Sequence, residues 1–412
     1  MTIRVAAIGT GNVGRHALTQ LITDPRFELT GVWVSSKAKA GKDAAELAGL
    51  DQPTGVTATT DLEAILAAKP ECVVYTAMAD NRLVEALEDY RRILAAGVNI
   101  VASAAVFLQY PWGTLPDEMI APIQQAAEAG NASIFVNGID PGFANDLLPM
   151  ALAGTCQSIE QIRCMEIINY DTYDSATVMF DVMGFGKPLD DIPMLLQPGV
   201  LSLAWGSVVR QLAAGLGISL DEVTETYVRE PAPEDFDIAS GHIAKDTAAA
   251  LRFEVRGMVG GKPVVVLEHV TRIRDDLCPE WPQPAQEGGS YRIEITGEPS
   301  YSVDLCLSSP NGDHNHAGLV ATAARVVNRH PRGRRRTAGY PHYVRLASHH
   351  RKRAVRWQLT GNSRQRRACH AYAVSHWCDR IGGHCGCCRR RPGRVGRPQR
   401  RGVQPADVHD HR

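Results

Sequence analysis

The stretch RVAAIGTGNVG, residues 4–14, decides the fold. Residues 4–8 predict a strand that is buried on both faces in a parallel sheet, and a helix is expected over residues 15–22. Between them, Gly9 allows a tight turn, Gly11 lets the backbone approach a pyrophosphate, and Gly14 lets the helix pack closely on the strand. This arrangement predicts a dinucleotide site at the positive N-terminus of the helix. The expected pyrophosphate ligands are Gly9, Thr10, Gly11, Asn12, Val13 and Gly14.

The end of the next strand bears on the choice of dinucleotide. A strand is expected over residues 27–34, and Ser35, Ser36 and Lys37 follow it. NAD enzymes place an Asp or Glu about 20 residues beyond the glycine loop to bind the ribose 2′-OH, and no carboxylate stands here. Hydroxyls and a lysine suit a 2′-phosphate, because charge-assisted hydrogen bonds to phosphate are strong. We therefore expect NADP; the alternative is a solvated turn that contacts no cofactor and leaves NAD open.

Strand and helix patterns alternate up to residue 145. Expected helices cover residues 61–68, 81–96 and 117–129, and expected strands cover residues 72–78, 98–103 and 132–137. This alternation predicts a doubly wound parallel sheet, a Rossmann domain over residues 1–145. Because the ligand of such a sheet lies beyond the carboxyl ends of the strands, Ala77, Met78 and Ser103 are expected beside the cofactor.

Strand patterns dominate from residue 146 onward. The expected strands cover residues 161–169, 176–182, 222–229, 251–259 and 262–273. Hairpin turns are expected at Gly260-Gly261 and around Gly297, and one helix over residues 200–216. We interpret residues 146–310 as an α+β substrate domain with a largely antiparallel sheet. Residues 311–328 then supply an amphipathic helix that is expected to return to the first domain.

Two loops of the predicted sheet carry the candidates for chemistry. Addition of a hydride to a C=O or C=N bond builds negative charge on the heteroatom, so the site needs a hydrogen-bond donor. The loops at residues 103–112 and 137–146 follow two strands and face the expected cleft. From them we take Tyr110 as the candidate donor, and Asp140, Asn145 and Asp146 as polar groups of the cleft. The alternatives are a plain turn at Asp140 and a helix cap at Asn145 and Asp146.

A His-x-His beside an Asp occurs in residues 313–316, DHNH. Such a set can bind zinc, but no other ligand set in residues 1–328 has metal spacing. We interpret it as a polar cap of the following helix and expect no metal.

Several segments resemble the dihydrodipicolinate reductase-like oxidoreductases. They are residues 9–14, residues 107–112 (FLQYPW) and residues 138–146 (GIDPGFAND). The branch that they resemble is that of 2,4-diaminopentanoate dehydrogenase and the native amine dehydrogenases, and residues 252–257 (RFEVRG) and 321–328 (ATAARVVN) extend the similarity. The resemblance implies a Rossmann domain with a smaller substrate domain and an NAD(P)-linked reduction of a C=N or C=O bond. It also implies a small-molecule substrate and a homo-oligomer, a dimer or a tetramer.

The sequence departs from that pattern in two places. Dihydrodipicolinate reductases carry His-His-x-x-Lys just after the Rossmann half, whereas the similar fragment here, residues 242–245 (HIAK), comes later and has one histidine. The amine dehydrogenases place a catalytic glutamate after the strand equivalent to residues 98–103, where this chain has Ala104-Ala105-Val106. Two functions follow: an NADP-dependent oxidoreductase of a small, amino-acid-derived substrate, or a dinucleotide-binding sensor without the catalytic acid.

The formal net charge of −1 over 412 residues conceals two unlike segments. Residues 1–328 hold 22 of the 44 Lys and Arg but 42 of the 45 Asp and Glu, which gives −20; residues 329–412 hold the other 22 basic residues and 3 acidic ones, which gives +19. No apolar run approaches the roughly 20 residues of a membrane-spanning helix, and residues 1–4 lead into the first strand rather than a signal peptide. We therefore expect a cytoplasmic protein that has no membrane partner and free thiols at its cysteines.

Residues 329–412 are Arg-rich and heavy in His, Pro, Gly and Cys. They can be a basic arm that binds nucleic acid, a zinc site, or a segment translated out of frame. The zinc interpretation would use Cys369, Cys378, Cys385, Cys387 and Cys388, whose spacing fits no known module. The segment begins inside a helical pattern, and codons for residues 329–336 read from the second base permit an apolar continuation of it. We expect a disordered, out-of-frame segment and no nucleic-acid partner.

Overall fold

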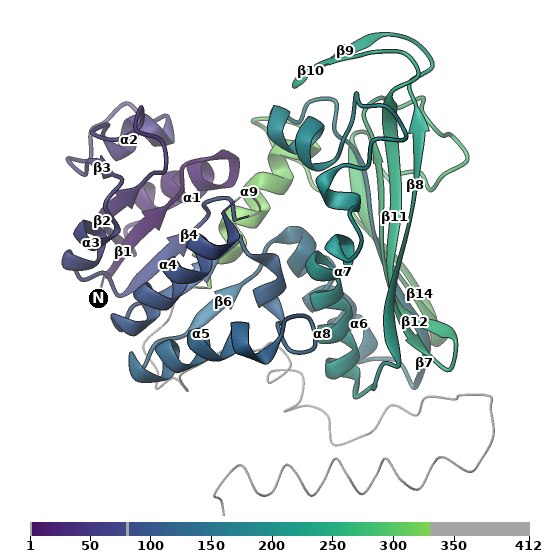
Figure 1. Ribbon diagram of the computed structural model, residues 1–412, viewed down its shortest axis with the longest axis horizontal. Helices are drawn as coiled ribbons and strands as arrows, with labels where there is room; N and C mark the ends of the chain where they lie inside the picture. The colour runs from purple at the N-terminus through teal and green to yellow at the C-terminus, as the bar shows by residue number, and fades with distance from the viewer. Residues whose placement is uncertain (1, 80–81, 330–412) are drawn as a thin grey trace, which may run out of the picture. The chain divides into compact units, whose positions relative to one another are not determined.

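Six parallel strands form the first sheet, in the order β3-β2-β1-β4-β5-β6 (Figure 1). Their bounds are β1 Ile3–Ile8, β2 Phe27–Trp33, β3 Ala58–Thr59, β4 Cys72–Tyr75, β5 Asn99–Ala102 and β6 Ile134–Val136. The computed structural model describes residues 2–79 and 82–329, which all lie in one compact unit. The strand order reverses between β1 and β4, and a crevice opens beyond the carboxyl ends of these strands. The predicted Rossmann sheet is confirmed.

Helices cover both faces of this sheet, because successive side chains of β1 point to opposite sides. Ala6 and Ile8 join a core with α3, α4 and α5, whereas Val5 and Ala7 join a core with α1, α2 and α9. The bounds are α1 Asn12–Thr23, α2 Ala44–Ala48, α3 Leu62–Ala67, α4 Leu83–Ala95, α5 Asp117–Ala129 and α9 His314–Val327. The last of these helices packs on α1, so the described chain returns to the domain in which it began.

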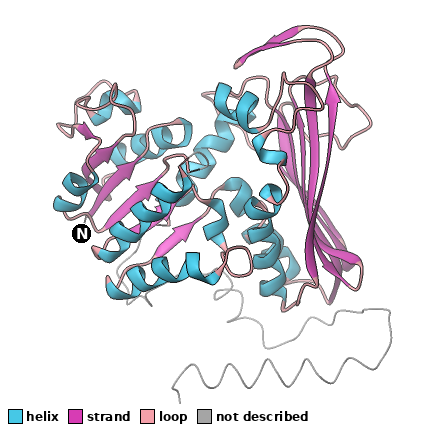
Figure 2. Cartoon of the chain, viewed as in Figure 1, coloured by secondary structure: helices cyan, strands magenta, loops and turns pink. Residues whose placement is uncertain are grey.

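A second six-stranded sheet has the order β14-β13-β7-β12-β11-β8. Figure 2 shows its long magenta strands on the right of the view. Its strands are β7 Ser158–Asn169, β8 Glu222–Pro231, β11 Ala248–Val259, β12 Lys262–Arg272, β13 Gly289–Glu298 and β14 Tyr301–Leu305. Both predicted hairpins form, β11 with β12 and β13 with β14. The central pair β7 and β12 is parallel, so the sheet is mixed. The remaining helices, α6 Leu147–Ala153, α7 Val200–Ala204 and α8 Gly206–Leu216, share its core.

One predicted strand is wrong and one small element was not expected. Residues 176–182 form helical turns over Thr177–Val182, and Met179 is buried there. Apolar residues recur at positions 178, 179, 182 and 183, which is the spacing of a helix. Because most of the segment is apolar, this spacing is hard to distinguish from the pattern of a buried strand. A two-stranded ribbon, β9 Phe236–Ile238 and β10 Gly241–Ile243, stands apart from both sheets.

The predictions for residues 330–412 lie outside the described residues. In the part of the chain that is described, no helix is long and apolar enough to cross a membrane.

Candidate active site

The three glycines of the first loop meet different surroundings. Gly9 has a φ of +96°, and a Cβ there would lie 2.4 Å from the backbone nitrogen of Ala77. A Cβ on Gly14 would lie 2.4 Å from the carbonyl oxygen of Gly9, so α1 packs closely on the turn. A Cβ on Gly11 would meet nothing within 4 Å, and no side chain caps the first turn of α1. The open cradle at Gly11 and the uncapped N–H groups fit a bound pyrophosphate.

A cavity of about 870 Å³ extends from this loop to the second domain. The predicted cofactor residues that line it are Gly9, Thr10, Gly11, Asn12, Val13, Ser35, Ser36, Ala77, Met78 and Ser103. Gly14 does not line it, because this glycine lies beneath the loop. Lys37 is exposed to solvent and does not line it either. Lys39, two residues beyond Lys37, does line the cavity. Its Nζ donates to the carbonyl oxygen of Thr10 at 3.0 Å.

Three of the four predicted catalytic residues lie outside the cavity. Tyr110 follows β5 but is not among the lining residues. Asn145 is buried and donates from Nδ2 to Asp140 Oδ1 at 2.6 Å. Asp146 is buried and accepts from the backbone N–H of Leu147, so it caps α6 as the alternative interpretation proposed. Asp140 is the predicted residue that does line the cavity.

The loop after β5 brings no ionisable side chain to the cavity. Residues 103–106 line it, and Ala105 adopts a left-handed conformation with a φ of +55°. The position at which the family resemblance implies a glutamate is therefore an apolar part of the wall.

A row of side chains across the second sheet forms the opposite wall. Phe253 of β11 pairs with His269 of β12, His269 pairs with Glu166 of β7, and Glu166 pairs with Tyr291 of β13. Directly paired residues project from the same face of a sheet, so these four side chains are neighbours. The rings of Phe253 and His269 stack, with centroids 4.6 Å apart and planes 7° from parallel. Glu166 and Tyr291 line the cavity.

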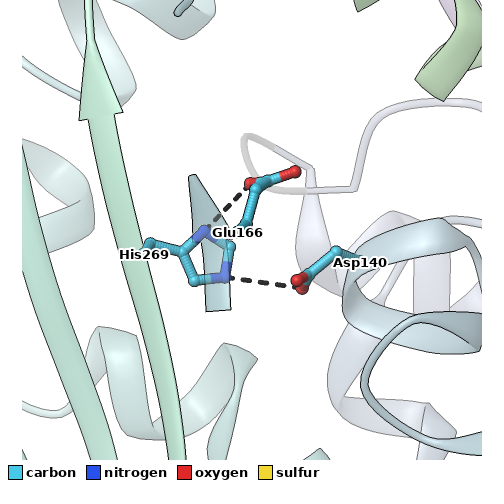
Figure 3. A group of neighbouring side chains, drawn as sticks. All are labelled: Asp140, Glu166 and His269. Atoms are coloured by element: carbon cyan, nitrogen blue, oxygen red, sulfur yellow. Dashed lines mark ion pairs between the residues drawn. The ribbon is translucent and has the colours of Figure 1, made fainter. Parts of the chain in front are cut away.

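His269 lies between two carboxylates (Figure 3). Its Nδ1 is 3.0 Å from Glu166 Oε2, and its Nε2 is 3.4 Å from Asp140 Oδ1. The longer contact is an ion pair rather than an aligned hydrogen bond. Asp140 Oδ1 also accepts from Asn145 and, at 3.1 Å, from Trp205 Nε1. Asp140 follows β6 of the first sheet, so the group joins the two domains.

The neighbouring carboxylates set the protonation state of His269. Burial disfavours the imidazolium of His269, but the carboxylates of Asp140 and Glu166 outweigh it and raise the pKa of His269 to about 10. His269 is therefore protonated at neutral pH. One ligand atom from each of the three side chains lies within 4.8 Å of the others, a spacing at which they could also hold a metal ion. The arrangement is a buried ion-pair triad.

Phenolic groups surround Glu166. Tyr170 donates to Glu166 Oε2 at 3.4 Å, and Tyr170, Tyr173 and Tyr291 line the cavity. Burial, and then the charge of Glu166, raises the pKa of Tyr170 and of Tyr291 well above the ordinary value. Both hydroxyls keep their protons at neutral pH and can act as hydrogen-bond donors.

The set DHNH begins α9 in the described structure. Asp313 caps the helix by accepting from the backbone N–H of His316 at 2.9 Å. His314 is directed elsewhere and contacts Gln286 Nε2 through Nδ1 at 3.2 Å. The cap interpretation thus agrees with the geometry.

A Rossmann sheet whose glycine loop opens on a cavity is typical of proteins that bind a dinucleotide, and the comparisons with known proteins identify the enzyme class. Residues 143–350 match the family described as the 2,4-diaminopentanoate dehydrogenase C-terminal domain. An amine dehydrogenase of Streptomyces virginiae is 41% identical over 317 residues, which cover 76% of this chain and 88% of the relative. The chain belongs to the 2,4-diaminopentanoate dehydrogenase and amine dehydrogenase family.

Two further proteins are similar to this chain at lower identity. The 2,4-diaminopentanoate dehydrogenase of Acetoanaerobium sticklandii is 23% identical over 340 residues, 80% of this chain and 91% of the relative. The solved amine dehydrogenase of Mycobacterium smegmatis has a TM-score of 0.64 at 20% identity, and covers 82% of this chain and 98% of that one. This second likeness shows a shared fold. The fold class and the enzyme class expected from the sequence are confirmed.

Proposed function

We propose that the protein is an NADP-dependent oxidoreductase that interconverts a small carbonyl compound and the corresponding amine. In the reducing direction a carbonyl compound, ammonium and NADPH give the neutral amine, NADP⁺ and water. The observation that supports this function best is that one continuous cavity joins the glycine loop to Glu166 and its phenolic neighbours. The relatives named for amine and 2,4-diaminopentanoate point to the same chemistry.

The residues of the chain have distinct tasks in this proposal. The residues around Gly11 hold the pyrophosphate, and the nicotinamide, when bound, supplies the hydride. Tyr170 and Tyr291 remain protonated at neutral pH, and their hydroxyl groups, that of Tyr170 donating to Glu166, face the reacting end of the substrate. The apolar residues 104–106 exclude water from the reacting carbon.

Two observations support NADP as the dinucleotide. Ser35 and Ser36 line the cavity beyond β2 together with Lys39. Neither position 35 nor position 36 carries the carboxylate that binds a ribose 2′-OH in NAD enzymes. A lysine and two hydroxyls complement a 2′-phosphate.

The proposal is tested by following NADPH oxidation with a panel of aldehydes, ketones and keto acids, each with and without ammonium. We expect turnover with at least one carbonyl compound only when ammonium is present, and release of the amine, identified by mass spectrometry. An NADPH oxidation rate that does not depend on ammonium would indicate reduction of the C=O bond itself. The apolar loop at residues 104–106 favours a second candidate, a dinucleotide sensor, which would bind NADPH tightly and oxidise none of the panel.

A further inference from the structure

The far wall of the cavity places two carboxyl groups against one imidazole. His269, with its raised pKa, contributes one positive charge at neutral pH, and it lies between the carboxylates of Asp140 and Glu166. The side chains of all three are at most 8% exposed. Two buried carboxyl groups that share one cationic partner favour the binding of a second cation, since a buried charge without a partner is costly.

The other cations that line the cavity are bound elsewhere, as far as the described residues show. Lys39 donates to the loop oxygens of Thr10. Arg82 donates to Tyr75 and pairs with Asp89 at 3.0 Å. Burial lowers the pKa of His314, the third basic group of the lining, so this histidine is neutral at pH 7.

The two carboxylates differ in what they can offer a ligand. Asp140 Oδ1 accepts from Asn145 and Trp205 and lies 3.4 Å from His269 Nε2, so this oxygen is engaged by three side chains of the protein. Glu166 lines the cavity with one oxygen toward His269, and Figure 3 shows the other oxygen directed away from the imidazole ring. Among the described residues, these two are the carboxylates of the lining.

We infer that Glu166 binds the nitrogen of the substrate as an ammonium or iminium cation, with Tyr170 and Tyr291 beside it. The inference rests on the proposed function for the identity of that nitrogen compound. It places the nitrogen-binding carboxylate on the second domain, across the cavity from the apolar loop at residues 104–106. His269 and Asp140 are positioning residues, because they act on the ligand through Glu166.

The test measures binding without turnover. Full-length protein saturated with NADPH is titrated with isopropylammonium, since an amine and a reduced cofactor cannot react. Glu166→Gln keeps the shape and removes the charge, and we expect the affinity for isopropylammonium to fall about 30-fold or more, the scale of a broken buried charge pair. The affinity for NADPH should change less than twofold. Glu160→Gln is the matched control, because Glu160 is exposed on the same strand.

A second measurement needs no variant and covers the case in which Glu166→Gln does not fold. Isopropanol has the shape of isopropylammonium without the charge, so the wild-type NADPH complex should prefer the cation by a similar factor. Equal binding of the two compounds, or unchanged amine affinity in folded Glu166→Gln, would overturn the inference. If the cation binds through Glu166 but no carbonyl compound is turned over with ammonium, the inference stands and the proposed function fails.

Discussion

Gly9 and Gly11 lie in one turn, but a side chain at Gly11 should weaken cofactor binding, whereas a side chain at Gly9 should lower the stability of the fold. Gly11→Val projects into the open cradle without a clash inside the protein. We expect a native circular dichroism spectrum and an NADPH affinity lower by about 100-fold or more, which corresponds to about 2.7 kcal/mol. Gly9→Ala forces a left-handed φ and a contact of 2.4 Å with Ala77, so it should lower the free energy of unfolding by about 1–3 kcal/mol. Normal NADPH binding by Gly11→Val would show that the loop holds no pyrophosphate.

His269 gives the folded protein a pH-dependent contribution to stability. Its folded pKa of about 10 lies above the ordinary value of 6.5, so this contribution is complete below about pH 6.5 and is lost as the pH rises toward 10. His269→Gln leaves two buried carboxylates without a cation, which should cost about 3–5 kcal/mol at pH 6. Denaturant unfolding at several pH values should show this difference shrinking toward pH 10.

His242→Gln is the control for that experiment. His242 is exposed on β10 and pairs with Asp237 at the surface. Its substitution should change the free energy of unfolding by less than about 0.5 kcal/mol at every pH. A difference for His269→Gln that does not vary with pH would argue that the imidazole acts through packing rather than charge.

At the scale of elements, the end of β2 governs cofactor choice. Lys39→Glu places a carboxylate where the 2′-phosphate is expected, so NADPH affinity should fall about 10-fold or more while NADH affinity changes little. Fluorescence titration with both cofactors measures this preference. Lys37→Glu adds the same charge two residues away on an exposed side chain and should have a smaller effect. Equal affinities of the wild type for the two cofactors would refute NADP specificity.

Helix α9 closes one face of the Rossmann sheet with its last turn. Val326 and Val327 are fully buried in the core that contains α1 and β1. Val326→Ala should lower the free energy of unfolding by about 2 kcal/mol, because two methyl groups and their packing are lost. Val320→Ala in the same helix should change it by about 0.5 kcal/mol or less, since Val320 is 38% exposed. Similar losses from both substitutions would mean that α9 is not anchored by this face.

At the scale of the whole molecule, the charge changes sign after residue 328, and the family match extends past that point to residue 350. The out-of-frame interpretation of residues 329–412 expects a missing or extra base near the codon of Asn328. Resequencing the gene across this codon decides the matter. An intact reading frame would exclude the slip, and the basic-arm interpretation, with binding to nucleic acid, would then take its place.

Local sequence patterns were sufficient to predict the fold of the first domain. Alternating strands and helices predicted the parallel sheet, and the spacing of three glycines predicted the loop that lines the cavity. In the second domain, the turns at Gly260-Gly261 and Gly297 predicted both hairpins. The helical turns at Thr177–Val182 were missed because a short apolar segment is compatible with either a strand or a helix.

The residues that form the far wall of the cavity could be brought together only with the tertiary structure. Glu166 and His269 each stand inside an apolar strand pattern, and an ionisable residue in such a strand is the signal that could have singled them out. Their partnership depends on the register of β7 and β12, which are more than 90 residues apart in the chain, and on Asp140 from the other domain. The glycine loop and the sheet around it could be predicted from residues 1–145 alone, because such a loop acts through its own backbone over a few residues. The pairing of Asp140, Glu166 and His269 at the cavity wall could be seen only in the folded chain, because burial and charge pairing arise from residues that the fold brings together.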